Sequence, residues 1–195
     1  LMGALAVIRQ AFLDVIHAQE TTLYLKKKTS PKLHLPHAGI RSLQKVLNDK
    51  EPFPVWIEPG SCLMENRALI LSQEFGIHPV IIATGDEWRR PDLALSKDHS
   101  YISPLLFPAL SKFPEDEDWE QVSLDQLRAW DHAPSNPALI SKNSKSLSFT
   151  TCGIGLGEFH ANLLKAIDRG LPKGKALAAL TINPARVCGI EQFTG

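Results

Sequence analysis

The segments Asn162–Leu171 (NLLKAIDRGL) and Lys175–Arg186 (KALAALTINPAR) decide how the rest of the chain is interpreted. In the first segment apolar residues recur at helical spacing, and Gly170 stands where helices commonly end in a left-handed residue. The second segment predicts another helix, and Asn183-Pro184 within it predicts the start of a last short turn. The chain therefore closes with two consecutive helices.

The composition is that of an ordinary globular domain. The chain has 195 residues, of which 44% are hydrophobic and 22% charged, and its formal net charge is +0. We therefore expect residues 1–195 to form a single, partial domain with a sizeable core. The balanced charge predicts no nucleic-acid partner and no membrane-surface partner, and no apolar run is long enough to span a bilayer.

Four short apolar segments predict strands, and helical periodicity follows each of them. The four segments are 54–60, 78–85, 101–107 and 147–153. Apolar strands that alternate with helices are typical of parallel βα units. A complete (β/α)8 barrel needs roughly 250 residues. The pattern thus predicts an α/β fold with about half of such a barrel, and an open doubly wound sheet is the alternative.

Several helices can be bounded from the sequence. Apolar spacing predicts a helix from residue 1 to about residue 20, which the lysine run 26–28 would end in solvent, and a short helix near residues 40–47. Gly76 is expected to end a third helix, and Pro91 to interrupt a fourth. Ser123 has capping-box spacing with Gln126, and Asn136 is expected to cap the helix that Pro137 begins.

The closing segment resembles the passage that closes the barrel of amidohydrolase-superfamily enzymes, which are metal-dependent hydrolases of C–N and related bonds. Residues 1–14 (LMGALAVIRQAFLD) resemble a helix of the imidazolonepropionase-like branch, and segments 54–58, 74–77 and 80–85 follow in that family's order. The resemblance covers nearly the whole chain. It implies a partial TIM-type barrel with strands five to eight, so that the first four strands and most of a small flanking β-domain would lie outside this chain.

The resemblance also implies where a catalytic site would lie. The family activates water on one or two divalent metals, usually zinc, held at the carboxyl ends of the strands. Strands five and six usually end in histidine ligands and strand eight in an aspartate, but the corresponding positions here hold Glu58, Thr84 and Cys152. The adjacent Gly85 and Gly153 are expected to line the same pocket.

The three substituted positions allow more than one role. Glu58 is a candidate metal ligand or catalytic acid/base, or else a carboxylate paired with an arginine or a backbone N–H. Cys152 is a candidate thiolate ligand and catalytic residue, or else a small buried thiol. Thr84 is a poor zinc ligand and is expected to be structural. The histidines, His34, His37, His78 and His160, are expected to lie outside the site.

Two functional classes follow from the resemblance, and a third does not need it. The first is a hydrolase of non-peptide C–N bonds in a small-molecule substrate, with an altered zinc site in this segment. The second is an inactive, metal-free relative that binds a ligand or a partner. The third is an independent α/β ligand-binding module. Half a barrel would leave two open sheet edges, which predicts self-association through them.

Overall fold

A computed structural model describes residues 2–27, 38–47, 55–109 and 120–194. The chain divides into two compact units. One consists of Leu1–Val55 with Leu71–His78, and the other of Trp56–Ile70 with Pro79–Gly195. The prediction of one partial domain over residues 1–195 stays a prediction. His34 and His37, and nearly all of the acidic segment at 113–120, lie outside the described residues.

The first unit is helical. It contains α1 (Met2–Lys27), α2 (Ala38–Gln44) and the end of α3 (Cys62–Glu74). The first predicted helix is confirmed and extends to the lysine run, so it is longer than expected. Val15 is fully buried, and the rings of Phe12 and Phe75 lie 5.0 Å apart between centroids. Burial of these apolar groups stabilises the unit. The Arg9–Glu74 ion pair is exposed and contributes little.

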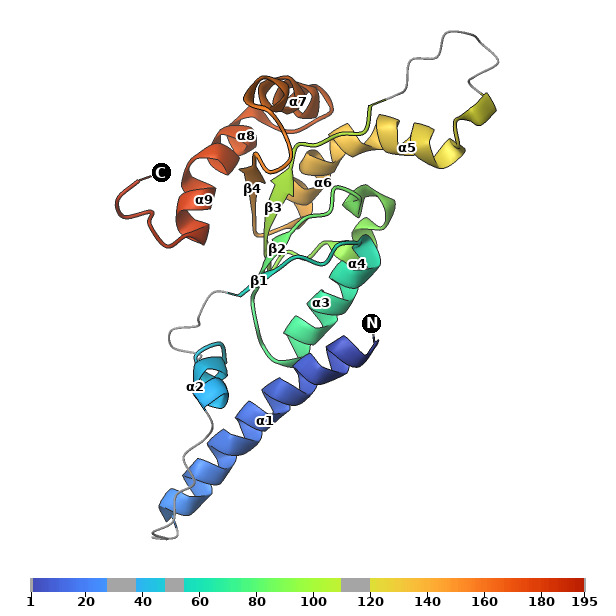
Figure 1. Ribbon diagram of the computed structural model, residues 1–195. Coiled ribbons are helices and arrows are strands. Elements are labelled where there is room, and N and C mark those ends of the chain that lie inside the picture. The colour runs from blue at the N-terminus through green and yellow to red at the C-terminus, as the bar shows by residue number, and fades with distance from the viewer. Residues whose placement is uncertain (1, 28–37, 48–54, 110–119, 195) are drawn as a thin grey trace. The chain divides into compact units, whose positions relative to one another are not determined.

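The second unit is built on a parallel sheet (Figure 1). The strands are β1 (Trp56–Ile57), β2 (Val80–Ile82), β3 (Ser100–Pro104) and β4 (Ser146–Thr150), and they lie in the order β1-β2-β3-β4. All three pairings are parallel. The predicted α/β class and the four parallel strands are confirmed. The strands are shorter than the apolar segments that predicted them, because prolines such as Pro59 and Pro79 flank them and cannot donate to a sheet.

Helices connect and follow the strands, as the periodicity predicted. In chain order they are α3, η1 (Glu87–Arg89), α4 (Pro91–Ala94), α5 (Leu124–His132), η3 (Ala133–Ser135), α6 (Asn136–Asn143), α7 (Leu156–Asp168), α8 (Lys173–Leu180) and α9 (Ile182–Val187). The two closing helices are confirmed as α7 and α8. Gly170 between them has a φ of 106°, a conformation that side-chain-bearing residues rarely adopt.

The helix starts at α5 and α6 differ from each other in how they are capped. At α5 the predicted capping box is present, since Ser123 accepts from the Gln126 amide and Gln126 accepts from the Ser123 amide. At α6 the expected cap is wrong. Ser135 precedes the helix and Asn136 is already its first residue. The Asn136 side chain instead turns inward to a buried carboxylate, described below.

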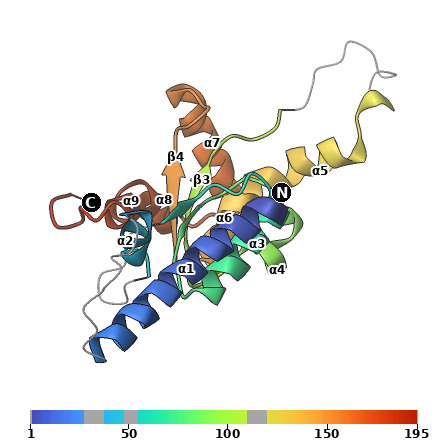
Figure 2. The ribbon, with the colours of Figure 1, turned by 60° about the horizontal axis from the view of Figure 1, so that its bottom comes forward.

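The sheet has one face covered by helices. Ile81, Tyr101 and Leu147 lie in register across β2, β3 and β4 and are almost completely buried. They form a core with residues of α6, α7 and α8, namely Ile140, Ala166, Ala176 and Ala179. Figure 2 shows α7 and α8 near β4 from a second direction. This is the layering expected of the outer face of a barrel.

The opposite face of the sheet is less covered. Ile82 and Ile102 lie in register there and are only half-buried, and Trp56 on β1 is 48% exposed. In a closed barrel this face would fill the interior. Within the described part of the chain, no helix has the length and apolar character needed to cross a bilayer.

Candidate functional site

The candidate site lies at the carboxyl edge of the sheet. Because the four strands are parallel, all their carboxyl ends lie at the same edge. Glu58 directly follows β1, Thr84 and Gly85 come shortly after β2, and Cys152 comes shortly after β4. The structure therefore places the positions predicted from the resemblance at one edge, where α/β folds keep their ligands.

The same topology separates two of these residues. β1 and β4 are the outer strands of the described sheet, so Glu58 and Cys152 follow strands that are three spacings apart. At ~4.8 Å per spacing this is about 14 Å along the sheet. Glu58 and Thr84 follow neighbouring strands. The site thus has a β1–β2 part and a separate β4 part.

Glu58 and Cys152 are both exposed. The Glu58 carboxylate forms no hydrogen bond and no ion pair with any residue that the structure describes. The expected pairing with an arginine or backbone N–H is therefore not seen in this part of the chain. The alternative that Cys152 is a buried thiol is wrong, because its side chain is exposed. It lies in an exposed turn after β4, where its amide donates to Thr150 Oγ1 at 3.2 Å.

The loop after β2 is held by a buried carboxylate. Glu87 is fully buried and accepts from the Thr84 amide at 2.5 Å, from Thr84 Oγ1 at 2.9 Å and from the Gly85 amide at 3.1 Å. A fourth bond comes from Asn136 Nδ2 at 2.6 Å. Gly85 has a φ of 90°, which lets the chain turn so that both amides reach one carboxylate. Thr84 thus helps to hold this loop, and its place in the wall of a pocket stays a prediction.

A second acid is buried beside Glu87. Glu65 on α3 is fully buried, and neither of its carboxyl oxygens has a hydrogen bond of normal geometry among the described residues. Burial, and then the neighbouring charge of Glu87, raise the pKa of Glu65 to about 10. Glu65 is accordingly a neutral acid at physiological pH, while Glu87 accepts four hydrogen bonds.

The two acids act on the groups around them. Burial raises the pKa of the Tyr101 hydroxyl, and the charges of Glu65 and Glu87 add to the effect. Burial likewise raises the pKa of the Cys62 thiol, and the same two acids add to it. Both groups stay protonated at neutral pH.

Sequence reasoning missed Glu65, Glu87 and Asn136. A signal for Glu65 exists, since it shares a helical face with Cys62 and Ala68, which are buried. An acid on the apolar face of a helix predicts a buried carboxyl. For Glu87 and Asn136 the local sequence carries no such signal, because they meet only after β2 and α6 are packed.

The described residues do not fit a complete metal site. Among them, no three His, Cys, Asp or Glu side chains lie close enough together to hold a metal ion. Glu58 and Cys152 follow the two outer strands of the described sheet, so they do not lie together. His160 is exposed on α7, and His78 is exposed in the other unit.

Comparison with known proteins identifies the fold. No protein-family model matches the chain, and no curated protein matches its sequence. A solved structure, that of an amidohydrolase from Thermotoga maritima MSB8, is similar over the whole of this chain, with a TM-score of 0.66 and 19% identity. The chain spans 47% of that protein's length, corresponding to its C-terminal half. The fold is therefore amidohydrolase-like and matches part of a barrel.

Proposed function

We propose that this chain forms part of a hydrolase that cleaves non-peptide C–N bonds in a small-molecule substrate. One observation carries the proposal: four parallel strands in sequential order, with Glu58 and Cys152 exposed after the outer two, in an amidohydrolase-like fold. In barrels of this kind, the residues at the carboxyl ends of the strands perform the chemistry.

Glu58 is the residue we assign to proton transfer. Its exposed carboxylate can take a proton from an attacking water and return it to the departing nitrogen, which is general acid–base catalysis. Cys152 is assigned to the opposite side of the substrate, and Thr84, Gly85 and Gly153 to the wall of the pocket. Glu87 acts only through Thr84 and Gly85, by fixing their backbone.

Zinc is the metal that the resemblance implies, and Glu58 is the ligand we propose for it. Since the described residues supply no complete set of ligands, zinc belongs to this proposal only if residues outside them complete the site. The roles given to Glu58 and Cys152 above therefore do not depend on a metal.

A binding protein without hydrolytic activity is the second candidate. It is favoured by Thr84, which stands where the family usually has a histidine ligand and whose amide and hydroxyl are both used by Glu87. A residue whose amide and hydroxyl already donate to a group in its own loop has few hydrogen bonds left for a substrate. The carboxyl edge would then be a ligand site without catalysis.

The two candidates predict different results in one experiment. The purified protein is incubated, with and without added zinc, with a panel of small amides, cyclic amides and amidines, and the released amine or ammonia is measured. The hydrolase proposal predicts turnover of at least one compound class. Saturable binding of panel compounds without amine release in either condition would reject it in favour of the binding protein. Metal analysis of the same sample reports whether zinc is retained.

A further inference from the structure

A buried acid lies behind the loop after β2 and has no role in the proposed chemistry. Glu65 on α3 is fully buried beside Glu87, the first residue of η1, which is fully buried as well. Glu87 accepts four hydrogen bonds, whereas neither oxygen of Glu65 has a hydrogen bond of normal geometry among the described residues. Ionising a buried carboxyl without such bonds is costly, so Glu65 keeps its proton only while its surroundings stay closed.

The loop after β2, residues 84–87, is held by a single buried side chain. Thr84 and Gly85 are half-buried, and Asp86 is exposed. Glu87 is buried, and its carboxyl group accepts from both the Thr84 and the Gly85 amide. These two amides therefore depend on Glu87 for their hydrogen bonds. If the Glu87 side chain withdraws, both amides become accessible to water at once.

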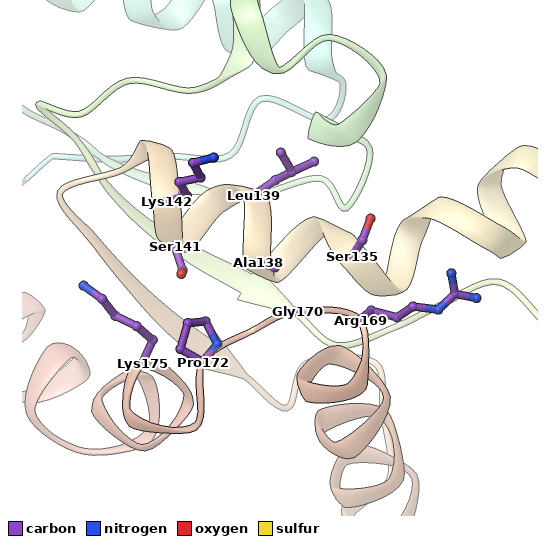
Figure 3. A pocket seen from close by; sticks show the side chains of 9 residues that line it. All are labelled: Ser135, Ala138, Leu139, Ser141, Lys142, Arg169, Gly170, Pro172 and Lys175. Atoms are coloured by element: carbon purple, nitrogen blue, oxygen red, sulfur yellow. The ribbon is translucent and has the colours of Figure 1, made fainter.

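The other groups around the Glu87 carboxyl belong to helices. Glu65 lies within α3, and Asn136 begins α6, whose Ile140 is fully buried in the core. Figure 3 shows Ala138 of α6 close to Gly170, in the turn that leads into α8, and a Cβ added at Gly170 would lie 4.0 Å from the Ala138 Cβ. Because α6 is packed in this way, the loop after β2 is the part that can move.

We propose that Glu65 couples the opening of the loop after β2 to the release of one proton. With the loop closed, Glu65 is buried beside Glu87 and keeps its proton. When Glu87 withdraws, water reaches Glu65, which ionises as an ordinary carboxyl does and passes its proton to the solvent. The opening becomes more favourable as pH rises, because the open form has lost a proton that the closed form keeps.

The neighbours of Glu65 define the pH range of this coupling. Burial, and then the charge of Glu87, raise the pKa of Glu65 from 4.5 to about 10 in the closed form. Two further titratable groups interact with Glu65, namely the Tyr101 hydroxyl on β3 and the Cys62 thiol on α3, and burial raises the pKa of both. Neither of them releases a proton near pH 7, so the coupling between pH 6 and pH 7.5 belongs to Glu65.

Amide hydrogen exchange, followed by NMR at pH 6, 6.5, 7 and 7.5, tests the coupling. Hydroxide catalyses exchange, so an amide whose opening releases no proton exchanges about tenfold faster per pH unit. Release of one proton on opening adds a further factor of about ten. We therefore expect the Thr84 and Gly85 amides to exchange about 100-fold faster per pH unit. The Gln126 amide, which donates to Ser123 Oγ at the start of α5, should show only the factor of about ten.

Two variants assign the released proton. Glu65→Gln keeps the shape of the side chain and has no proton to lose, so the Thr84 and Gly85 amides should return to about tenfold per pH unit. Glu158→Gln removes an exposed carboxyl of α7 and should keep the steep dependence. A steep dependence that persists in Glu65→Gln would overturn the proposal.

The wild type alone also decides the question. Equal pH dependence of the Thr84 and Gln126 amides would show that opening releases no proton, and it would overturn the proposal. Thr84 should also be less protected than Leu147 on β4, because the loop opens while the core stays folded. Equal protection of the two would mean that only global unfolding exposes the loop, and this too would overturn the proposal. The outcome does not depend on whether the carboxyl edge is catalytic.

Discussion

At the scale of single residues, two neighbouring carboxyl groups in the interior need a physical explanation. Glu65 and Glu87 are both fully buried, and two like charges at that place would repel each other strongly. The two carboxyl groups differ in how many hydrogen bonds they accept. Glu87 receives four hydrogen bonds, whereas Glu65 receives none of normal geometry and keeps its proton. Because burial opposes ionisation of Glu65, its titration should change the free energy of unfolding.

We predict that Glu65 makes the protein less stable as pH rises. Its pKa is raised from 4.5 to about 10 in the folded state, so between these values the folded protein holds a proton that the unfolded chain releases. The free energy of unfolding therefore falls as pH rises through that window, by up to about 1.4 kcal/mol per pH unit. Glu65→Gln has the same shape and no proton to lose, so it should remove this slope.

Urea unfolding of the wild type and of Glu65→Gln at pH 5.5, 7 and 8.5 measures the effect. The difference in free energy between the two proteins should grow steadily in favour of the glutamine variant. Glu158→Gln on α7 is the matched control, since Glu158 is exposed. Parallel pH profiles for wild type and Glu65→Gln would show that Glu65 is not the buried neutral acid described above.

At the scale of elements, one side chain connects α6 to the loop after β2. Asn136 begins α6 and its Nδ2 donates to Glu87, which holds the loop. Asn136→Ala should destabilise the protein by about 1–3 kcal/mol, because it removes a donor from a buried carboxylate. Asn143→Ala in the same helix removes only a half-buried bond to the Leu139 carbonyl and should cost less. Equal costs in denaturant unfolding would contradict this account.

The two helix starts give a second prediction at this scale. Ser123 caps α5 through its side chain, whereas Ser135 makes no side-chain cap for α6. Ser123→Ala should therefore lower the free energy of unfolding by about 1 kcal/mol. Ser135→Ala should lower it by less, since Ser135 Oγ only donates back to the His132 carbonyl. Chemical denaturation of the two variants side by side tests the difference. A larger loss of stability in Ser135→Ala than in Ser123→Ala would contradict the prediction.

The elements also show what could be inferred from sequence. Apolar runs and flanking Gly or Pro residues were enough to locate the four strands, the capping box at Ser123 and the closing helices, because these features depend on nearby residues. The cap of α6 was misassigned because Asn136 is used by Glu87, which lies 49 residues away. The exposure of Cys152 was misjudged for a similar reason, since a cysteine's burial depends on which elements cover it.

At the scale of the whole molecule, the sheet has two outer strands, β1 and β4, in the described part of the chain. We predict that this chain self-associates through these edges, because unpaired strand edges and a half-covered apolar face favour pairing. Trp56→Lys places a charge on β1 and should reduce the associated fraction. Leu124→Lys changes an exposed leucine of α5 instead and should not. Light scattering after size exclusion measures both, and a monomeric wild type would contradict the prediction.

Under the proposed function, the carboxyl edge of this sheet performs hydrolysis through Glu58. The most direct measurement is kcat and KM for the C–N substrate turned over best by the wild type, in Glu58→Gln and in the exposed control Glu158→Gln. We predict that Glu58→Gln lowers kcat by roughly 100-fold or more, as loss of a general acid–base does, while KM changes little. The control should match the wild type. A Glu58→Gln variant with wild-type kcat would contradict the claim.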